Sequence, residues 1–292
     1  MDLRTGLKIK IANNAGFCFG VKRAINLAEK TADKERKVYT LGPIIHNPQE
    51  VKRLEKKRIK ILTDINKIKN GSIILRTHGI PFNLHKKLIK NKDINIIDAT
   101  CPFVKRAQII MKQLSTDLNS KDKIVIIVGE RVHPEVIALM SYSNNGRCVV
   151  IENVVEAQNF KFIGDLNIVS QTTQTPENFE NIVEILKKQH GVKVYNTICK
   201  ATFDRQKSAE KLAKNVDLMI VVGGKNSGNT TRLTQICSAN TNTYHIETVG
   251  SIKEEWFKDI DSVGLTAGAS TPDWIIKEVE EKVKEISMKY HY

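Results

Sequence analysis

The sequence of 292 residues has no long hydrophobic run, since apolar stretches such as Ile124–Val128 and Leu218–Val222 are short. None approaches the roughly 18 apolar residues of a membrane-spanning helix, so we expect no membrane association. The N-terminal residues lack the apolar segment of a secretory signal, which predicts a cytoplasmic protein. Cysteine is scarce, and its odd count of five argues against a framework of disulfides in an intracellular chain.

Aromatic residues are also few, at 6%, although 46 basic and 32 acidic residues give a net charge of +14. An RNA-binding protein typically places aromatic side chains among its basic ones, and no such motif is present, so we expect no nucleic-acid partner. The charge then indicates an anionic substrate, an acidic protein partner, or simply a lysine-rich surface. The densest basic run, residues 52–60, is interpreted as a solvated helix face.

Three segments of the chain follow one plan, in which a short strand ends at a cysteine and a helix begins there. Cys18, Cys101 and Cys199 hold this position, and the tetrapeptide Val-Lys-Arg-Ala follows the first two. Each segment continues with a strand that ends in glycine, a polar turn, a helix, and a third strand before a proline. Such alternation of strands and helices predicts an α/β fold with parallel sheets.

We therefore predict three related α/β domains around a pseudo-threefold centre. Their boundaries are placed at residues 18–100, 101–198 and 199–288, and the N-terminal strand, residues 8–17, is expected to complete the third domain. Ligands bind at the carboxyl ends of strands in open parallel sheets, so the polar turns are expected to face one centre.

The three matched cysteines are the first candidates for a functional site. Three thiolates without a fourth suit a [4Fe–4S] cluster with one iron open to substrate. They also suit a zinc site with water in the fourth position. Cys148 and Cys237 occupy no matched position and are interpreted as core residues.

The turns at the strand ends carry side chains suited to an anionic substrate. Several precede helices, whose N-termini attract anions, and Ser227–Asn229 is the clearest candidate for phosphate binding, although the P-loop pattern is absent. Glu135 follows Pro134 at a predicted helix start, where the helix dipole favours a carboxylate. The candidate residues are His46, His78, His133, Glu135, Thr172, Ser227, Asn229 and Ser270.

Nine motifs together resemble the LytB/IspH family of 4-hydroxy-3-methylbut-2-enyl diphosphate reductases, from about Ile9 to the C-terminal helix. They are GFCFGVKRAI, HNPQEV, RTHG, DATCPFV, HPEV, SQTTQT, ICKATFDRQ, GGKNSGNTTRL and TAGASTP. The resemblance implies a trefoil-like fold around a central iron–sulfur cluster. It also implies reductive removal of a hydroxyl from an allylic diphosphate, the last step of the non-mevalonate isoprenoid pathway, with isopentenyl and dimethylallyl diphosphate as products.

The resemblance further implies a role for each candidate residue. Cys18, Cys101 and Cys199 match the ligands of the [4Fe–4S] cluster, and Glu135 and Thr172 match the groups that deliver a proton, with Thr172 also positioning the substrate. An acidic electron donor of the ferredoxin or flavodoxin type is expected. The residues that match the diphosphate site are His46, His78, His133, Ser227, Asn229 and Ser270.

One position departs from the family pattern. Many members have a second serine after the first in the SxN turn, where this chain has Gly228, so one possible phosphate donor is missing. The alternative enzyme assignment is quinolinate synthase, which also binds an iron–sulfur cluster through three cysteines. Its carboxylate substrates would favour more arginine in the turns than this sequence has.

Overall fold

The computed structural model describes residues 6–116, 122–143 and 147–290. In this part of the chain, strands form three four-stranded sheets, and every pair of neighbouring strands runs parallel. Helices alternate with the strands along the sequence. The predicted α/β class with parallel sheets is confirmed. Among the described residues, no helix has the length and apolar character needed to cross a bilayer.

The first sheet is formed by residues that follow Cys18. Its strand order is β3-β2-β4-β5. The strands are β2 (Val38–Leu41), β3 (Ile59–Leu62), β4 (Gly71–Leu75) and β5 (Ile94–Asp98), and the helices are α1 (Phe19–Lys34), α2 (Pro48–Lys56), η1 (Ile65–Lys67) and α3 (Phe82–Lys90).

The second sheet follows Cys101 and has the order β7-β6-β8-β9. Its strands are β6 (Lys123–Val128), β7 (Cys148–Ile151), β8 (Asp165–Ser170) and β9 (Val192–Tyr195), and its helices are α4 (Pro102–Thr116), α5 (Pro134–Ser141), α6 (Val154–Asn159) and α7 (Pro176–Lys187).

The third sheet joins the two ends of the chain, because the N-terminal strand β1 pairs with β12 in the order β1-β12-β10-β11. Its strands are β1 (Lys8–Ile11), β10 (Leu218–Val222), β11 (Asn242–Ile246) and β12 (Ser262–Ala267), and its helices are α8 (Lys200–Ala213), α9 (Gly228–Ser238), η2 (Val249–Ser251), η3 (Glu254–Phe257) and α10 (Asp273–Tyr290).

The three sheets share one topology. In each, a first strand (β2, β6 or β10) lies between a second and a third strand, and a fourth strand (β5, β9 or β1) forms the edge beside the third. The direction of the chain across the sheet therefore reverses between the first and third strands. Such a switch point is where open parallel sheets bind ligands, at the carboxyl ends of the strands.

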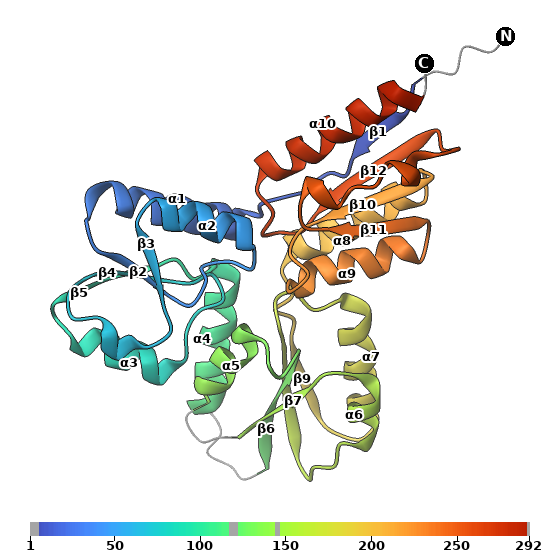
Figure 1. The fold of residues 1–292 in the computed structure, drawn as a ribbon. Coiled ribbons are helices and arrows are strands. Elements are labelled where there is room, and N and C mark those ends of the chain that lie inside the picture. The colour runs from blue at the N-terminus through green and yellow to red at the C-terminus, as the bar shows by residue number, and fades with distance from the viewer. Residues whose placement is uncertain (1–5, 117–121, 144–146, 291–292) are drawn as a thin grey trace. The chain divides into compact units, whose positions relative to one another are not determined.

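Strand β10 is apolar along its whole length, and β6 is apolar after Lys123, because helices cover both faces of their sheets. In β6, Val125 and Ile127 pack with α4 and α5, whereas Ile126 and Val128 pack with α6 and α7 on the other face. In the third sheet, α10 lies along one face, and α8 and α9 cover the other (Figure 1).

The proline after the third strand of each segment lies at the start of a helix. Pro81 is the residue before α3, Pro176 is the first residue of α7, and Pro272 precedes α10. A proline suits these positions because the first turn of a helix leaves its backbone N–H groups unbonded. The interpretation of residues 52–60 as one helix face is wrong in part, since α2 ends at Lys56 and residues 59–60 begin β3.

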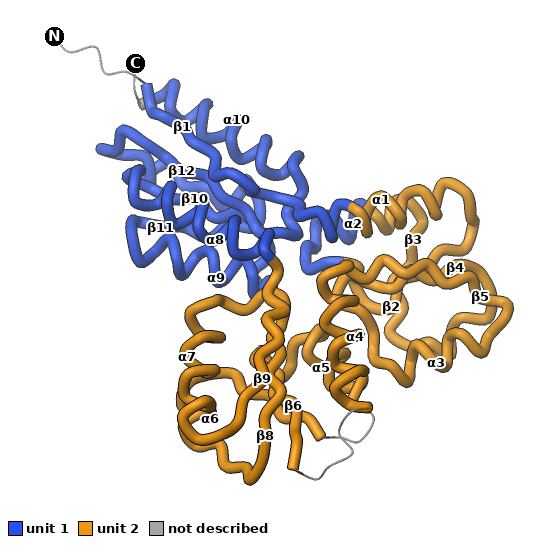
Figure 2. Tube along the Cα trace, turned by 180° about the vertical axis from the view of Figure 1, so that it is seen from behind, with its two compact units in different colours: residues 1–22, 45–53, 200–292 blue, residues 23–44, 54–199 orange. Residues whose placement is uncertain are grey.

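Two compact units make up the chain, coloured in Figure 2. Unit 1 comprises residues 1–22, 45–53 and 200–292 and contains the third sheet, whereas unit 2 comprises residues 23–44 and 54–199 and contains the first two sheets. The three-domain boundaries at residues 18, 101 and 199 stay a prediction.

Candidate functional site

The eight polar candidates all follow the first or third strand of a sheet, where the strand order reverses. His46 follows β2, and His78 follows β4. In the second sheet, His133 and Glu135 follow β6, and Thr172 follows β8. Ser227 and Asn229 follow β10, and Ser270 follows β12. His46, Ser227, Asn229 and Ser270 belong to unit 1, and His78, His133, Glu135 and Thr172 belong to unit 2.

The three matched cysteines follow the fourth, edge strand of each sheet. Cys18 comes after β1, Cys101 after β5 and Cys199 after β9, and helices α1, α4 and α8 begin at the next residue. Their side chains are partly exposed. Of the remaining two, Cys237 is fully buried as predicted, whereas Cys148 is only partly buried against the core.

Each matched cysteine is bonded through its backbone N–H to the turn that follows the third strand of its sheet. The N–H of Cys18 donates to the Ala269 carbonyl at 3.2 Å, and that of Cys101 donates to Thr77 at 3.0 Å. The N–H of Cys199 donates to the carbonyl of Thr172 at 2.8 Å. Ala269 and Thr77 directly precede Ser270 and His78. In all three sheets, therefore, one backbone hydrogen bond connects the matched cysteine to a turn that carries one of the polar candidate residues.

Glu135 and Thr172 form a buried pair. Their side chains are 1% and 4% exposed. The backbone N–H of Thr172 donates to Oε1 of Glu135 at 2.6 Å, and the Thr172 hydroxyl donates to Oε2 at 2.8 Å. Burial raises the pKa of Glu135 to about 7, although the two hydrogen bonds from Thr172 favour the carboxylate and oppose that rise. A carboxyl with a pKa near neutrality is suited to donate a proton.

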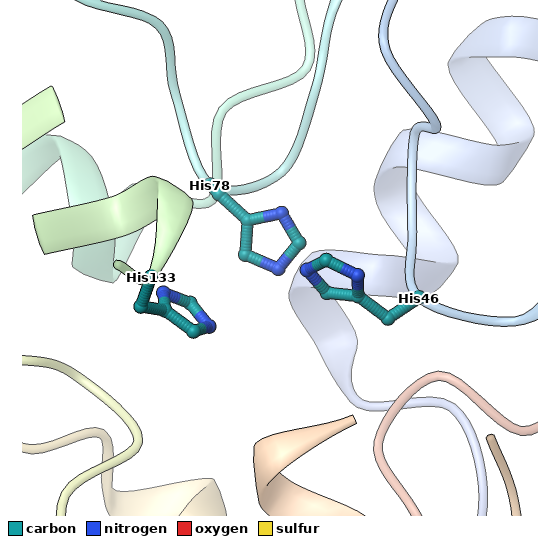
Figure 3. A group of neighbouring side chains, drawn as sticks. All are labelled: His46, His78 and His133. Atoms are coloured by element: carbon teal, nitrogen blue, oxygen red, sulfur yellow. The ribbon is translucent and has the colours of Figure 1, made fainter. Parts of the chain in front are cut away.

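His133 is the residue before helix α5, and its ring accepts at Nδ1 from the backbone N–H of Glu135, at 3.1 Å. The proton of the neutral ring therefore lies on Nε2, which makes that nitrogen the donor. The His78 ring meets the His133 ring edge-on, with centroids 5.5 Å apart and an angle of 83° between the planes. Figure 3 shows the His78 ring on its loop and the His133 ring at the start of a helix.

The turns of unit 1 present hydroxyl and amide groups at the start of α9. Ser227 is the N-cap of this helix, and its side chain accepts from the N–H of Thr230 at 3.4 Å. Asn229 is 7% exposed, and neither its Oδ1 nor its Nδ2 has a hydrogen-bond partner among the residues that the structure describes. A buried amide without partners costs free energy, so Asn229 is a candidate for contact with a ligand. The Ser270 hydroxyl donates to the backbone carbonyl of His46 at 3.1 Å.

Gly223 allows the turn after β10 to form. Its φ of +149° lies outside the range of L-residues, and a Cβ there would lie 2.7 Å from Oγ1 of Thr271 and 2.9 Å from Oγ1 of Thr230. The chain can therefore pass close to these two buried threonines before reaching Ser227.

Sequence reasoning did not single out two arginines that the structure connects to the cysteine-bearing turns. Arg205 donates to the carbonyls of Asn14 and Gly16, and Arg23 donates to those of Asp98 and Thr100. The signal was present for Arg23, which lies in the repeated Val-Lys-Arg-Ala tetrapeptide. The repeated pattern alone could not predict which backbone carbonyls accept hydrogen bonds from Arg23.

These features define a class of protein: a parallel α/β protein in which each of three sheets has a cysteine after its edge strand and polar turns after its central strands. Residues 9–284 match the family model described as LytB protein. The chain belongs to the LytB family, so the resemblance seen in its motifs is confirmed.

Sequence similarity to known proteins extends over nearly the whole chain. The chain is 47% identical over 283 residues to the 4-hydroxy-3-methylbut-2-enyl diphosphate reductase of Syntrophotalea carbinolica, covering 96% of this chain and 100% of that protein. It is 48% identical over 287 residues to the enzyme of the same name from Aquifex aeolicus, covering 95% and 96%.

Solved structures are similar as well. A structure of (E)-4-hydroxy-3-methyl-but-2-enyl diphosphate reductase, described as the terminal enzyme of the non-mevalonate pathway, is 45% identical with a TM-score of 0.70, covering 96% of this chain and 99% of that chain. The reductase of Plasmodium falciparum is 28% identical with a TM-score of 0.86, covering 96% and 88%.

Proposed function

We propose that this protein is an oxidoreductase that removes the hydroxyl of 4-hydroxy-3-methylbut-2-enyl diphosphate and yields isopentenyl and dimethylallyl diphosphate. This is the last step of the non-mevalonate isoprenoid pathway. The observation that carries the proposal is the threefold pairing of a cysteine with a polar turn, in a chain that matches reductases over almost its full length. We also propose that the enzyme acts in the cytoplasm, in line with its sequence.

The proposed cofactor is a [4Fe–4S] cluster held by Cys18, Cys101 and Cys199. These residues fit the group because all three are partly exposed cysteines whose backbone positions are held by hydrogen bonds. Three ligands leave one iron of a cluster open. When bound, the cluster supplies electrons one at a time and a Lewis-acidic iron for the hydroxyl.

The substrate's diphosphate would be bound by histidine, hydroxyl and amide groups. The Nε2–H of His133 is a donor because its Nδ1 already accepts from Glu135. The buried amide of Asn229 can donate to and accept from the substrate, and α9 adds the favourable potential of a helix N-terminus. At Gly228 only the backbone N–H is left to donate. The proposed diphosphate-binding residues are His46, His78, His133, Ser227, Asn229 and Ser270.

Proton delivery is assigned to Glu135 together with Thr172. Replacing C–OH by C–H and releasing water consumes two electrons and two protons. The Glu135 carboxyl, with its pKa near 7, can hold a proton at working pH, and the Thr172 hydroxyl at 2.8 Å can pass it toward the leaving oxygen and hold that oxygen in place. Exclusion of water around this pair follows from its burial and prevents loss of the proton to solvent.

The proposed electron donor is an acidic protein of the ferredoxin or flavodoxin type, because the chain carries a net charge of +14. We expect the rate with such a donor to fall several-fold between about 0.05 and 0.3 M salt, since salt screens attraction between exposed charges. The check is steady-state turnover with a reduced ferredoxin across this range. With dithionite in place of the protein the rate should stay constant; an equal fall with both reductants would contradict an electrostatic docking step.

The test of the function is turnover. Protein reconstituted with iron and sulfide under anaerobic conditions should convert the allylic diphosphate to both products when a one-electron reductant is supplied, as measured by mass spectrometry. Protein that retains its iron and shows no conversion would overturn the proposed reaction.

A further inference from the structure

Arg205, on helix α8, binds the backbone of the turn that leads to Cys18. Its side chain is 2% exposed. Nε donates to the carbonyl of Asn14 and Nη2 donates to that of Gly16, both at 2.8 Å. The planar guanidinium offers its donors in a fixed fork, so two carbonyls bound at once have a defined separation and direction.

The turn that Arg205 holds has an unusual backbone. Asn14 has a φ of +64° and Gly16 a φ of +89°, so two of its residues are in left-handed conformations. A Cβ on Gly16 would lie 2.9 Å from Cδ1 of Ile276. Such a turn needs outside contacts to keep one conformation, because an asparagine in this region gives up free energy relative to the usual helical or extended one.

Arg23, on helix α1, does the same for the turn that leads to Cys101. Its Nη2 donates to the carbonyl of Asp98 at 3.2 Å, and its Nη1 donates to that of Thr100 at 3.3 Å. The Asp98 side chain in turn accepts from the N–H of Thr100 at 3.0 Å and from Lys105 at 2.6 Å. The turn before Cys101 is therefore held by hydrogen bonds to its backbone carbonyls and to the Asp98 side chain.

We propose that Arg23 and Arg205 are positioning residues for the cysteine ligands. Each arginine lies on the helix that begins after one cysteine and fixes the backbone of the turn that precedes a different cysteine. Arg205 lies on the helix that follows Cys199 and holds the turn of Cys18; Arg23 lies on the helix that follows Cys18 and holds the turn of Cys101. The inference rests on the proposed function, since it holds that these contacts keep the cysteines in place to bind the cluster.

The repeat supplies a matched control. Arg106 occupies the same place in the second Val-Lys-Arg-Ala tetrapeptide as Arg23 does in the first, and its side chain is exposed on α4. Replacing Arg106 with Met removes the same charge and the same residue type from an equivalent helix position. A general effect of charge on the protein would appear in both variants.

The experiment compares Arg23→Met, Arg23→Lys and Arg205→Lys with Arg106→Met and the unchanged protein. Each is reconstituted anaerobically, and iron per chain and the rate of iron release to a chelator are measured. We expect Arg23→Met to release iron at least about fivefold faster, because an unheld turn lets the Cys101 thiolate leave more often. Lysine should rescue only in part, since one ammonium cannot span two carbonyls as the fork does. Arg106→Met should match the unchanged protein.

Hydrogen exchange of the cluster-free proteins provides the second measurement. In Arg23→Met, exchange should rise at residues 98–101 and stay unchanged in the third sheet. Global unfolding of both Arg23 variants would mark Arg23 as a general structural residue and overturn the inference. Equal iron release from Arg23→Met and the unchanged protein would also overturn it. Failure of the unchanged protein to bind iron would instead overturn the proposed function itself.

Discussion

The Glu135→Gln variant is expected to lose turnover by about 100-fold or more while still binding the substrate. Proton transfer by a placed side chain typically contributes factors of 10² to 10⁴, and a glutamine amide cannot supply that proton. The amide is nearly the same size as the carboxyl, so the variant should keep the buried site filled. Turnover under anaerobic conditions, together with substrate binding by calorimetry, separates the two effects.

The chain offers a close control for this variant. Glu177 follows Pro176 in the first turn of α7, as Glu135 follows Pro134 in the first turn of α5, but its side chain is exposed. Glu177→Gln should therefore leave turnover unchanged. Near-normal turnover of Glu135→Gln would show that another group delivers the proton.

The pH dependence follows from the same carboxyl. Burial raises the pKa of Glu135 to about 7, so the group stays protonated in the folded protein well above the usual range of a glutamate. As the pH rises through about 7, the protonated fraction falls, and the rate of a step that needs this proton falls with it. In the residual activity of Glu135→Gln this alkaline decline should disappear, because the amide does not titrate.

Replacing Cys101 with Ser is expected to remove the cluster and with it all turnover above background. A serine hydroxyl stays protonated at neutral pH and is a poor ligand for iron, whereas thiolates are the usual ligands of iron–sulfur clusters. The backbone N–H that donates to Thr77 is retained, so the turn should keep its place. Iron content, visible absorbance and Mössbauer spectra of the reconstituted protein provide the measurement.

Cys148→Ser is the matched variant for this experiment. Its thiol is also partly exposed, but it belongs to strand β7 and follows no edge strand. It should retain iron and turnover in full, so loss of iron from Cys148→Ser would contradict the assignment of the three ligands. Colourless protein that holds one zinc per chain would favour the alternative of a three-cysteine zinc site.

Much of the fold could be read from local patterns. The apolar strands that end at cysteine or glycine, with helical spacing after them, predicted parallel sheets, and the structure has three of them with a shared order. The basic run at residues 52–60 shows where such reasoning fails. Its charged residues suggested one helix face, but Ile59 is buried in β3, and a break after Lys56 cannot be recognised from charge alone.

By itself, the sequence determined the α/β class, the three matched cysteines, the polar turns and the family, because each depends on residues close together in the chain. Only the tertiary structure decided which hydrogen-bond partners these residues have and how deeply they are buried. Glu135 and Thr172 become a buried pair only when the turns after β6 and β8 come together, and that burial sets the pKa. The contacts of Arg205 with Asn14 and Gly16 likewise join residues that lie 191 and 189 positions apart in the sequence, and local periodicity cannot predict contacts over such separations.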